Sequence, residues 1–268
     1  MIENKRVRTP PLLIAHRGES RDAPENTLAS INLAWARGAA AVEIDVRLGA
    51  GGEPVVIHDA DTRRIGGPAT PVARQTTAQL RSLDAGRWKS RRWAGERIPF
   101  LREVLETTPE GGRLIVELKE GPESVAPVAS AWEASALRTQ LRAHQLTFMS
   151  FNHATVAELA RECGSRSQSR ARGAPVCLLL EKKIWRQPCE LARALDFARE
   201  HRLAALNLEA GPALDQPLIA RIHEEGLRVY CWTVNRIATA RRLLRAGIDG
   251  VTTDRCAWMR ERLGIEFS

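Results

Sequence analysis

Three carboxylates fall in two short segments whose residue pattern is typical of β-strands. Glu43 and Asp45 belong to the run Ala-Val-Glu-Ile-Asp-Val at 41–46, and Glu117 belongs to the run Leu-Ile-Val-Glu-Leu-Lys at 114–119. Because strand side chains alternate between faces, Glu43 and Asp45 share one face, and Glu117 shares a face with Lys119. Buried like charges are costly unless one of them is protonated or a cation lies between them. We expect that cation to be a divalent metal ion.

The types of these side chains favour a hard metal ion. No Cys or His lies at ligand spacing beside the three acids, and oxygen donors suit Mg²⁺ or Ca²⁺ better than zinc. For Glu43 or Asp45 alone, a polar strand face open to solvent is an equally good interpretation. The return of the same pattern around Glu117, in a chain whose strands should be covered on both sides, favours the metal site.

Two histidines could transfer protons beside such a metal. His16 ends the apolar run 12–16, and His58 follows the apolar run 55–57. Either histidine alone would more often be structural. Placed around a metal-bound anion, the pair suits phosphodiester cleavage, in which one imidazole removes a proton and the other donates one to the leaving alkoxide. Arg17, next to His16, offers a planar donor fork for a phosphate group.

The elements that must position these residues alternate along the chain. Eight apolar runs predict strands, with amphipathic, helix-like stretches between them, which favours a closed parallel (β/α)₈ TIM barrel of the α/β class. Neither phosphate-loop motif of the open doubly wound sheets occurs. In a barrel, the carboxyl ends of the strands converge on one face. The residues expected there are His16, Glu43, Asp45, Glu117, Lys119, Trp232 and Asp254. The expected strands cover 12–16, 41–48, 114–118, 146–151, 176–180, 205–208, 228–233 and 250–253. A helical pattern follows each of them, and examples are 26–37, 101–107, 124–141, 154–161, 190–199, 215–225 and 237–246.

The length of 268 residues suits one barrel domain spanning residues 1–268. Between the second strand and the helix expected near 101–107, the segment 59–99 is an excess of about 40 residues, which is long for a connecting loop. This segment carries Trp88 and Trp93. We expect it to form a small insertion over the mouth of the barrel.

The charge balance argues against a nucleic-acid partner. The net charge is +8, but 35 of the 40 basic residues are arginines scattered along the whole chain, and no aromatic residues interleave with a basic stripe. The surplus implies only a general attraction to anionic substrates. The densest basic stretch, 161–172, is typical of a solvated loop. No apolar run approaches the roughly 20 residues of a membrane span, and residues 1–9 lack a signal-peptide core, so we expect a cytoplasmic protein without stable membrane insertion.

These residues together resemble the glycerophosphodiester phosphodiesterase family, specifically its short bacterial cytosolic members. The similarity runs through nearly the whole chain, and the motifs occur in the family's order. They are His-Arg-Gly at 16–18, Pro-Glu-Asn-Thr at 24–27, Glu-Ile-Asp-Val at 43–46, Val-Ile-His-Asp at 56–59, Leu-Arg-Ser-Leu-Asp-Ala-Gly at 80–86, Ile-Pro at 98–99, Glu-Leu-Lys at 117–119, Ser-Phe at 150–151, Trp-Thr-Val-Asn at 232–235 and Gly-Ile-Asp-Gly-Val-Thr-Thr-Asp at 247–254.

The resemblance implies hydrolysis of small glycerophosphodiesters to sn-glycerol 3-phosphate and an alcohol. It implies that His16 and His58 are the acid/base pair, without saying which is the acid, and it leaves open whether water or the glycerol 2-hydroxyl attacks first. It further implies the remaining roles: Glu43, Asp45 and Glu117 as metal ligands, Arg17 and Lys119 as phosphate contacts, and Trp232 on the glycerol side.

Two departures from the family pattern are visible. Arg255-Cys256 follows Asp254 where the family usually has a proline, and the basic stretch 161–172 is longer than usual. Asp254 has two interpretations, as a site residue or as an anchor of the last strand. Two rival functions remain at this point: a lysophospholipase D or sphingomyelinase D type activity, which would need an apolar surface for an acyl chain, and a phosphodiester-binding barrel without turnover. The sequence predicts no oligomeric state.

Overall fold

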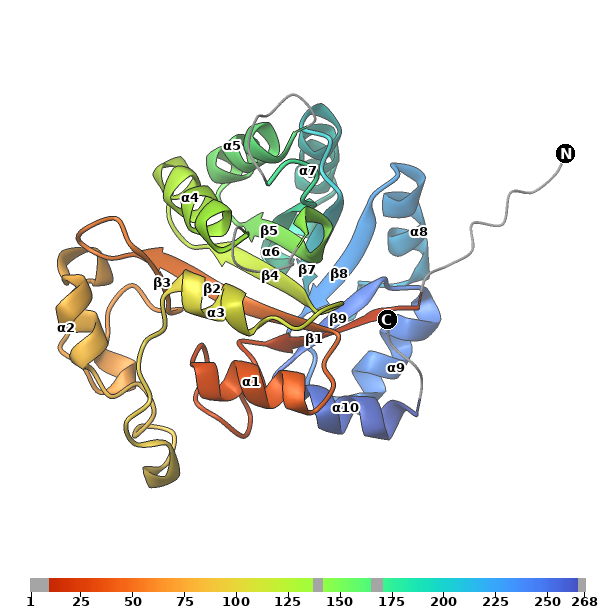
Figure 1. The fold of residues 1–268 in the computed structure, drawn as a ribbon. Coiled ribbons are helices and arrows are strands. Elements are labelled where there is room, and N and C mark those ends of the chain that lie inside the picture. Colours follow the sequence, from red (N-terminus) through yellow and green to blue (C-terminus); the bar gives the residue numbers. More distant parts are fainter. Residues whose placement is uncertain (1–9, 137–141, 165–170, 265–268) are drawn as a thin grey trace, which may run out of the picture.

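A closed barrel of eight parallel strands forms the centre of the molecule (Figure 1). The computed structural model describes residues 10–136, 142–164 and 171–264. The order around the ring is β1, β9, β8, β7, β6, β5, β4 and β2, and the pairing of β1 with β2 closes it. The TIM barrel expected from the sequence is therefore confirmed. The strands are β1 (Leu12–His16), β2 (Ala41–Leu48), β4 (Arg113–Leu118), β5 (Leu146–Ser150), β6 (Val176–Leu180), β7 (Ala205–Glu209), β8 (Arg228–Trp232) and β9 (Gly250–Thr253).

Helices surround the barrel and alternate with its strands (Figure 1). Within the described parts of the chain, no helix is long and apolar enough to cross a membrane. The short α6 was not expected from the sequence, and no bounds were predicted for the helix α10 that follows the last strand. The end of the helix predicted over 124–141 lies outside the described residues. The helices around the barrel are α1 (Leu28–Ala36), α3 (Leu101–Thr107), α4 (Val125–Ala136), α5 (His153–Cys163), α6 (Lys182–Trp185), α7 (Pro188–Glu200), α8 (Gln216–Glu224), α9 (Ile237–Ala246) and α10 (Cys256–Leu263).

Short polar side chains start several of these helices. Thr27, Asn152 and Asp215 each accept a hydrogen bond from the backbone N–H three residues later, which satisfies a donor that the helix leaves unpaired. Gly247 ends α9 in the left-handed conformation, with φ of 93°. The signals at the helix starts set the length of the loops at the barrel mouth, and Gly247 sets the length of a loop at the opposite end of the barrel.

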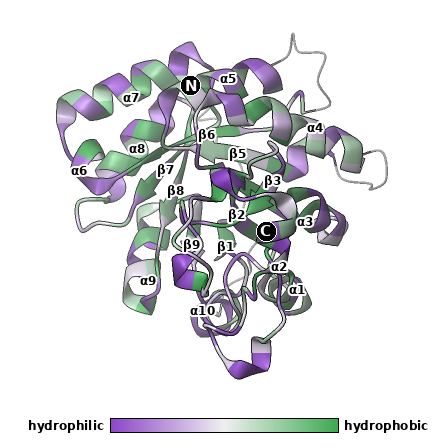
Figure 2. Ribbon diagram, turned by 90° about the vertical axis from the view of Figure 1, so that its left-hand side faces the viewer, coloured by the Kyte–Doolittle hydropathy of each residue, from purple (hydrophilic) through white to green (hydrophobic). Residues whose placement is uncertain are grey.

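Two apolar layers result from the alternation of side chains along the strands. On β2, Val42, Ile44 and Val46 point outward and pack in the large cluster that the helices cover. The strands stand out as hydrophobic in Figure 2, while the outer faces of the helices are hydrophilic. The alternate side chains of the strands fill the barrel interior, where the buried apolar members are Leu12, Ile14, Ala41, Ile115, Met149, Cys177, Leu179 and Ala205. Glu43 and Asp45 have the same inward parity, so the sequence periodicity directs two acids into the barrel.

The segment after β2 forms a small unit with its own apolar cluster. A short strand, β3 (Pro54–Val56), runs antiparallel to the end of β2, and α2 (Thr77–Ser82) follows within the insertion. The buried members of the cluster are Val55, Ile57, Ile65, Val72, Leu80, Ala85, Ile98 and Phe100. None of the clusters inside or around the barrel contains a described residue from 59–99.

The insertion lies beside the barrel mouth rather than over all of it (Figure 1). Lys89 Nζ donates to the Ser20 carbonyl at 2.7 Å, and Trp93 Nε1 donates to the Asp22 carbonyl at 3.1 Å. Both acceptors belong to the loop that follows β1. The expected position is thereby corrected, because the pairing of β3 with the end of β2 leads the chain toward the β1 side. The expectation of one domain over residues 1–268 stays a prediction.

The separate cluster of the insertion leads to a stability prediction. Leu80 is fully buried there, so Leu80→Ala should destabilise the insertion by about 2–5 kcal/mol through lost burial and a residual cavity. Because the barrel core shares no side chain with this part of the chain, we expect limited proteolysis to cut within 59–99 under conditions that leave the far-ultraviolet circular dichroism of the barrel unchanged. Equal loss of both signals would show instead that insertion and barrel unfold as one unit.

Candidate active site

Strand register brings the predicted acids and one histidine together at the carboxyl end of the barrel. His16 is the register partner of Glu43 across β1 and β2, and Asp45 is the register partner of Glu117 across β2 and β4. All four side chains point into the barrel, so strand pairing alone brings them close together. Lys119 follows β4 by one residue and reaches back to the same place.

The three carboxylates form one buried cluster. Glu43, Asp45 and Glu117 are 2%, 0% and 7% exposed, and each offers an oxygen that lies within 4.8 Å of the oxygens of the other two. Asp45 Oδ1 is fully buried and accepts no hydrogen bond of good geometry, although it pairs with the Lys119 ammonium at 3.2 Å. Three oxygen donors this close together fit a hard divalent cation. The structure thus brings together all three predicted metal ligands.

Two cationic side chains partly neutralise this cluster. Arg17 Nε lies 2.9 Å from Asp45 Oδ2. Lys119 Nζ lies 3.2 Å from Asp45 Oδ1 and 2.5 Å from Glu117 Oε1. Both predicted phosphate contacts therefore lie at the acids, and an anion that binds there would meet a guanidinium and an ammonium group.

The surroundings shift the pKa values of the three acids in different directions. Burial, followed by repulsion from Asp45 and Glu117, raises the pKa of Glu43 well above its usual range. Burial and the charge of Asp45 raise the pKa of Glu117 to about 7. Burial alone would also raise the pKa of Asp45, but Arg17 and Lys119 outweigh it and lower that pKa. The cluster without a metal thus carries one firmly ionised acid and two that hold protons readily.

The loop after β1 adopts two uncommon backbone conformations beside the cluster. Arg17 and Asn26 both have φ of 57°, in the left-handed region. In this conformation the backbone N–H of Arg17 donates to Glu43 Oε2 at 3.1 Å. Asn26 donates to Asp45 Oδ2 at 2.8 Å and accepts from the Asp45 backbone N–H at 3.2 Å. Residues with a strained backbone persist where surrounding contacts stabilise them. Here Arg17 and Asn26 each form a hydrogen bond with a carboxylate of the cluster.

Gly18 is required by close packing in the same loop. Its φ is 82°, and a Cβ at this position would lie 2.4 Å from the backbone carbon of Ser30 in α1. Any side chain would push the loop away from the helix. The His-Arg-Gly motif at 16–18 therefore combines a site residue, a charged contact and a spacer that lets the loop approach α1.

His16 is oriented by a carboxylate from the other end of the chain. His16 Nδ1 lies 2.6 Å from Asp254 Oδ1. Asn235 holds Asp254 in turn, because its Nδ2 donates to Asp254 Oδ2 at 2.5 Å and its Oδ1 accepts from the Asp254 backbone N–H at 3.0 Å. His16 Nε2 points toward the cluster, 3.9 Å from Glu43 Oε2. Asp254 thus contacts the imidazole predicted to be catalytic and is also tied to Asn235, so both interpretations of this residue stay open.

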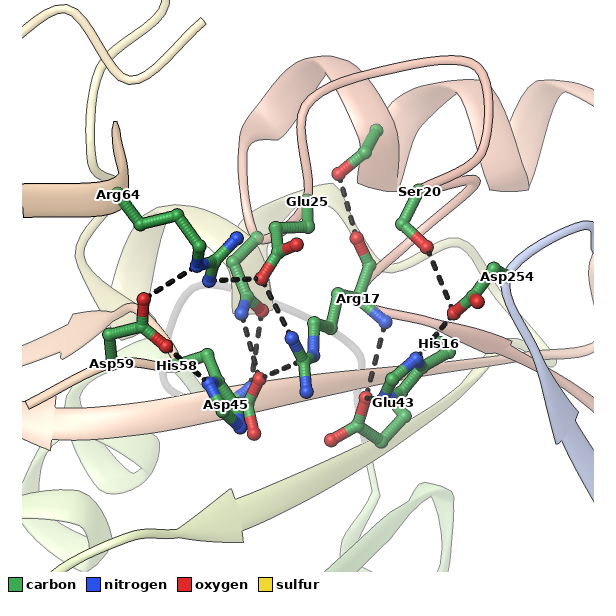
Figure 3. A network of polar contacts seen from close by, with 12 residues as sticks. His16, Arg17, Ser20, Glu25, Glu43, Asp45, His58, Asp59, Arg64 and Asp254 are labelled. Carbon is green, nitrogen blue, oxygen red and sulfur yellow. Dashed lines mark hydrogen bonds and ion pairs between the residues drawn. The ribbon is translucent and has the colours of Figure 1, made fainter. Parts of the chain in front are cut away.

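His58 is oriented in the same way by its neighbour in sequence. His58 Nδ1 lies 2.7 Å from Asp59 Oδ1, and Arg64 Nε donates to Asp59 Oδ2 at 2.6 Å (Figure 3). Arg47 Nε also donates to the His58 carbonyl at 2.8 Å. Burial, opposed in part by Asp45, lowers the pKa of the His58 imidazole. Each predicted proton-transfer residue therefore has one ring nitrogen bound to a carboxylate, which leaves the other nitrogen for a substrate.

An aromatic pair lies beyond the charged cluster. Trp232 ends β8, and its ring meets that of Phe151 edge-on with centroids 5.5 Å apart. Phe151 is 37% exposed, and no other large hydrophobic side chain among the described residues is classed as exposed. Of the remaining histidines, His144 and His153 are exposed, while His201 and His223 are half-buried, and His223 pairs with Asp249 at 2.7 Å.

Several residues of the site were given no role by the sequence analysis. Glu25 Oε1 accepts from Arg17 Nη1 at 2.7 Å and from Arg64 Nη2 at 2.8 Å. Asp59 and Asn26 hold His58 and Asp45. A signal did exist, because all three residues belong to the family motifs at 24–27 and 56–59, but only the folded chain shows which partner each takes.

The basic stretch 161–172 was expected to be a solvated loop. Its first three residues instead belong to α5, and residues 165–170 lie outside the described part of the chain.

The raised pKa of Glu43 predicts how a substitution changes the stability of the metal-free protein. A carboxyl group whose pKa is raised by folding stabilises the fold below its unfolded pKa, and that contribution is lost as the pH rises through the folded pKa. Glu43→Gln should therefore stabilise the EDTA-treated protein at pH 8, by on the order of 1–4 kcal/mol, and have little effect at pH 5. Thermal unfolding at both pH values measures this difference.

Glu106→Gln, on an exposed position of α3, is the control for loss of a carboxylate. It should change stability equally little at both pH values. If Glu43→Gln were as neutral as this control at pH 8, the unfavourable charge at the cluster would be absent.

Comparison with known proteins agrees with this site. The family model described as the glycerophosphoryl diester phosphodiesterase family matches residues 16–257. A glycerophosphodiester phosphodiesterase from Caldanaerobacter subterraneus subsp. tengcongensis is 30% identical over 91% of this chain and 93% of its own length. A phosphodiesterase from Oleispira antarctica, solved with the product sn-glycerol-3-phosphate, is 27% identical with a TM-score of 0.80 over 96% of this chain and 98% of its own. This chain belongs to the glycerophosphoryl diester phosphodiesterase family.

Proposed function

We propose that this protein hydrolyses glycerophosphodiesters to sn-glycerol 3-phosphate and an alcohol, with a divalent metal ion and two histidines. One observation carries the proposal: His16 lies beside Glu43 and His58 lies beside Asp45 (Figure 3). Each of these histidines also has Nδ1 close to a carboxylate oxygen, at 2.6 and 2.7 Å. The family membership and the product in the Oleispira antarctica relative support the substrate class.

The two Nδ1 contacts suit a pair of proton-transfer groups. A carboxylate at Nδ1 fixes the ring orientation and favours the tautomer whose Nε2 can accept a proton from a nucleophile. The same carboxylate stabilises the imidazolium that forms, or supports a donor that is already protonated. Asp254 and Asp59 would act in this way on His16 and His58, and both routes of attack, by water or by the glycerol 2-hydroxyl, need one acid and one base.

The metal would be held by Glu43, Asp45 and Glu117, with Mg²⁺ as the proposed ion. When bound, it would supply positive charge to the phosphate oxygens. Arg17 and Lys119 would bind the same phosphate from the protein side, because both cations already face the acids at 2.5–3.2 Å. Trp232, paired with Phe151, would contact the glycerol carbons. The substrate is a small molecule, and a cytoplasmic location without a nucleic-acid partner stays a prediction.

The rival activities have less support. An enzyme that accepts an acyl chain needs an apolar surface beside its site, whereas Phe151 is the one exposed large hydrophobic among the described residues. A phosphodiester-binding barrel without turnover would be expected to lack one of the acids or histidines. All five of these residues are present in this chain.

Removal of the metal is the first test of the proposal. After dialysis against EDTA, hydrolysis of glycerophosphocholine should fall to background, and Mg²⁺, Mn²⁺ or Ca²⁺ should restore it, because the phosphate charge is then compensated again. Calorimetric titration of the metal-free protein with Mg²⁺ gives an independent measurement. We expect heat of binding for the wild type and its loss in Glu43→Gln. Full activity after extensive chelation would contradict metal dependence.

Substitution of the histidines is the second test. His16→Ala and His58→Ala should each lower kcat on glycerophosphocholine by about 10²–10⁴-fold, which is the usual contribution of one proton transfer. Calorimetry should show that both variants still bind Mg²⁺.

The leaving group then assigns the acid. A p-nitrophenyl phosphodiester needs no proton when its phenolate leaves, so the variant that lacks the general acid should regain activity on this substrate, and the variant that lacks the base should not. Glycerophosphocholine rates near that of the wild type for either variant would overturn the acid/base pair. His144→Ala, at an exposed position, is the matched control.

A further inference from the structure

One side chain of the insertion reaches both the phosphate side and the histidine side of the proposed site. Arg64 lies in the short turn Arg63–Ile65. Its Nε donates to Asp59 Oδ2 at 2.6 Å, and its Nη2 donates to Glu25 Oε1 at 2.8 Å (Figure 3). Glu25 belongs to the loop after β1, so Arg64 bridges that loop and the segment that carries His58.

Each partner of Arg64 holds a residue of the site with its remaining contact. Asp59 uses Oδ1 for His58 Nδ1, at 2.7 Å. Glu25 Oε1 also accepts from Arg17 Nη1, at 2.7 Å. The result is a row of alternating charge that runs from Asp45 through Arg17, Glu25, Arg64 and Asp59 to His58. Removing the central cation would leave two carboxylates without the charge that separates them.

We propose that Arg64 is a positioning residue that fixes the Arg17 guanidinium and the His58 imidazole relative to each other. This inference rests on the proposed function of the site. Arg64 acts through Glu25 on one side and through Asp59 on the other, and the insertion thereby becomes part of the catalytic geometry.

The surroundings support an ordered bridge rather than an incidental surface ion pair. Exposed ion pairs contribute little because two flexible side chains must be held in water. Here the Glu25 and Asp59 side chains are 17% and 29% exposed, and Arg64 itself is 40% exposed. The Arg64 guanidinium also lies 5.6 Å from the centre of the Trp88 ring. Lys89 and Trp93 of the same insertion bind carbonyl groups of the loop after β1, which fixes the two segments against each other.

The planar fork of arginine is what makes the bridge. Nε and Nη2 address two carboxylates from two segments at once, whereas a lysine ammonium is a single point on a flexible stem. Arg64→Lys should therefore keep one contact and lose the other. Arg64→Met keeps the stem beside Trp88 and removes both contacts.

The matched control is Arg63→Met. Arg63 is the neighbouring residue in the same turn, and its side chain is 72% exposed. Among the described residues, Asp61 is the one acid that pairs with it. Both substitutions remove one positive charge from the insertion. A difference between them therefore reports the bridge and not the net charge.

Steady-state kinetics of the Mg²⁺-loaded enzyme on glycerophosphocholine is the main measurement. For Arg64→Met we expect kcat to fall and KM to rise, because the two arms of the bridge serve His58 and Arg17, with a loss in kcat/KM of about 10- to 100-fold. Arg64→Lys should recover part of that loss. Arg63→Met should stay within about twofold of the wild type, and the variants should have similar melting temperatures.

A second measurement does not depend on turnover. Hydrogen exchange of the backbone amides in 17–26 should become faster in Arg64→Met than in the wild type, and it should be unchanged in Arg63→Met. If the wild type itself failed to hydrolyse any glycerophosphodiester, the proposed function would fail, whereas faster exchange in Arg64→Met would still support the bridge.

Comparison of substrates separates positioning from direct contact. If Arg64 acts through Glu25 and Asp59, the loss should be similar for glycerophosphocholine, glycerophosphoethanolamine and glycerophosphoglycerol. A loss confined to one alcohol would overturn the proposal in favour of headgroup contact. Kinetics of Arg64→Met equal to those of Arg63→Met, with unchanged exchange in 17–26, would also overturn it.

Discussion

The rest of this structure depends on an electrostatic constraint, the burial of three carboxylates at one end of a parallel barrel. Glu43, Asp45 and Glu117 are nearly free of solvent contact, and their oxygens lie within 4.8 Å of one another. In the absence of a metal, two of the three respond by raised pKa values, while Asp45 is kept ionised by Arg17 and Lys119. Such a cluster destabilises the fold that carries it unless a cation is supplied. The nearby basic side chains, the loop after β1 and the insertion can all be understood as answers to this excess of negative charge.

Those answers come from parts of the chain that are far apart in sequence. Asn26 and the Arg17 backbone bind the acids from the loop after β1, and Lys119 binds them from the end of β4. Asp254 after the last strand and Asp59 in the insertion bind the two histidines instead. Left-handed backbone at Arg17 and Asn26 costs free energy, and it persists because each residue binds a buried carboxylate. The barrel supplies a rigid ring of strand ends, and the loops supply the compensating charges. A mutation in any of these loops should therefore be felt at the acids even though it leaves the barrel core intact.

The sequence predicts the part of this arrangement that follows from periodicity. Alternation along β2 places Glu43 and Asp45 inside, and the order of eight strands places β1, β2 and β4 side by side, so periodicity and strand order together assign His16, Glu43, Asp45 and Glu117 to one place. A helix after the last strand was expected, but no bounds were predicted for α10, in which only Cys256 and Met259 are buried. The ion pairs of Glu25, Asp59 and Arg64 also lay beyond prediction. They are made by side chains on irregular segments, where no period fixes the direction of a residue and long side chains have several partners within reach.

The insertion is attached to the barrel by a few apolar contacts and by several polar ones. Its apolar cluster is separate from the barrel core, so hydrophobic packing alone would hold it only through β3 and the start of α3. Polar contacts from Arg64, Lys89 and Trp93 to the loop after β1 add three further points of attachment, all next to the site. Apolar contacts are tolerant of small shifts, whereas charged hydrogen bonds are directional and short. An insertion fixed by such bonds can hold His58 at a defined position relative to Arg17, although His58 lies outside the eight strands of the ring. The barrel sets where the acids are, and the polar contacts of the insertion set where the second imidazole is.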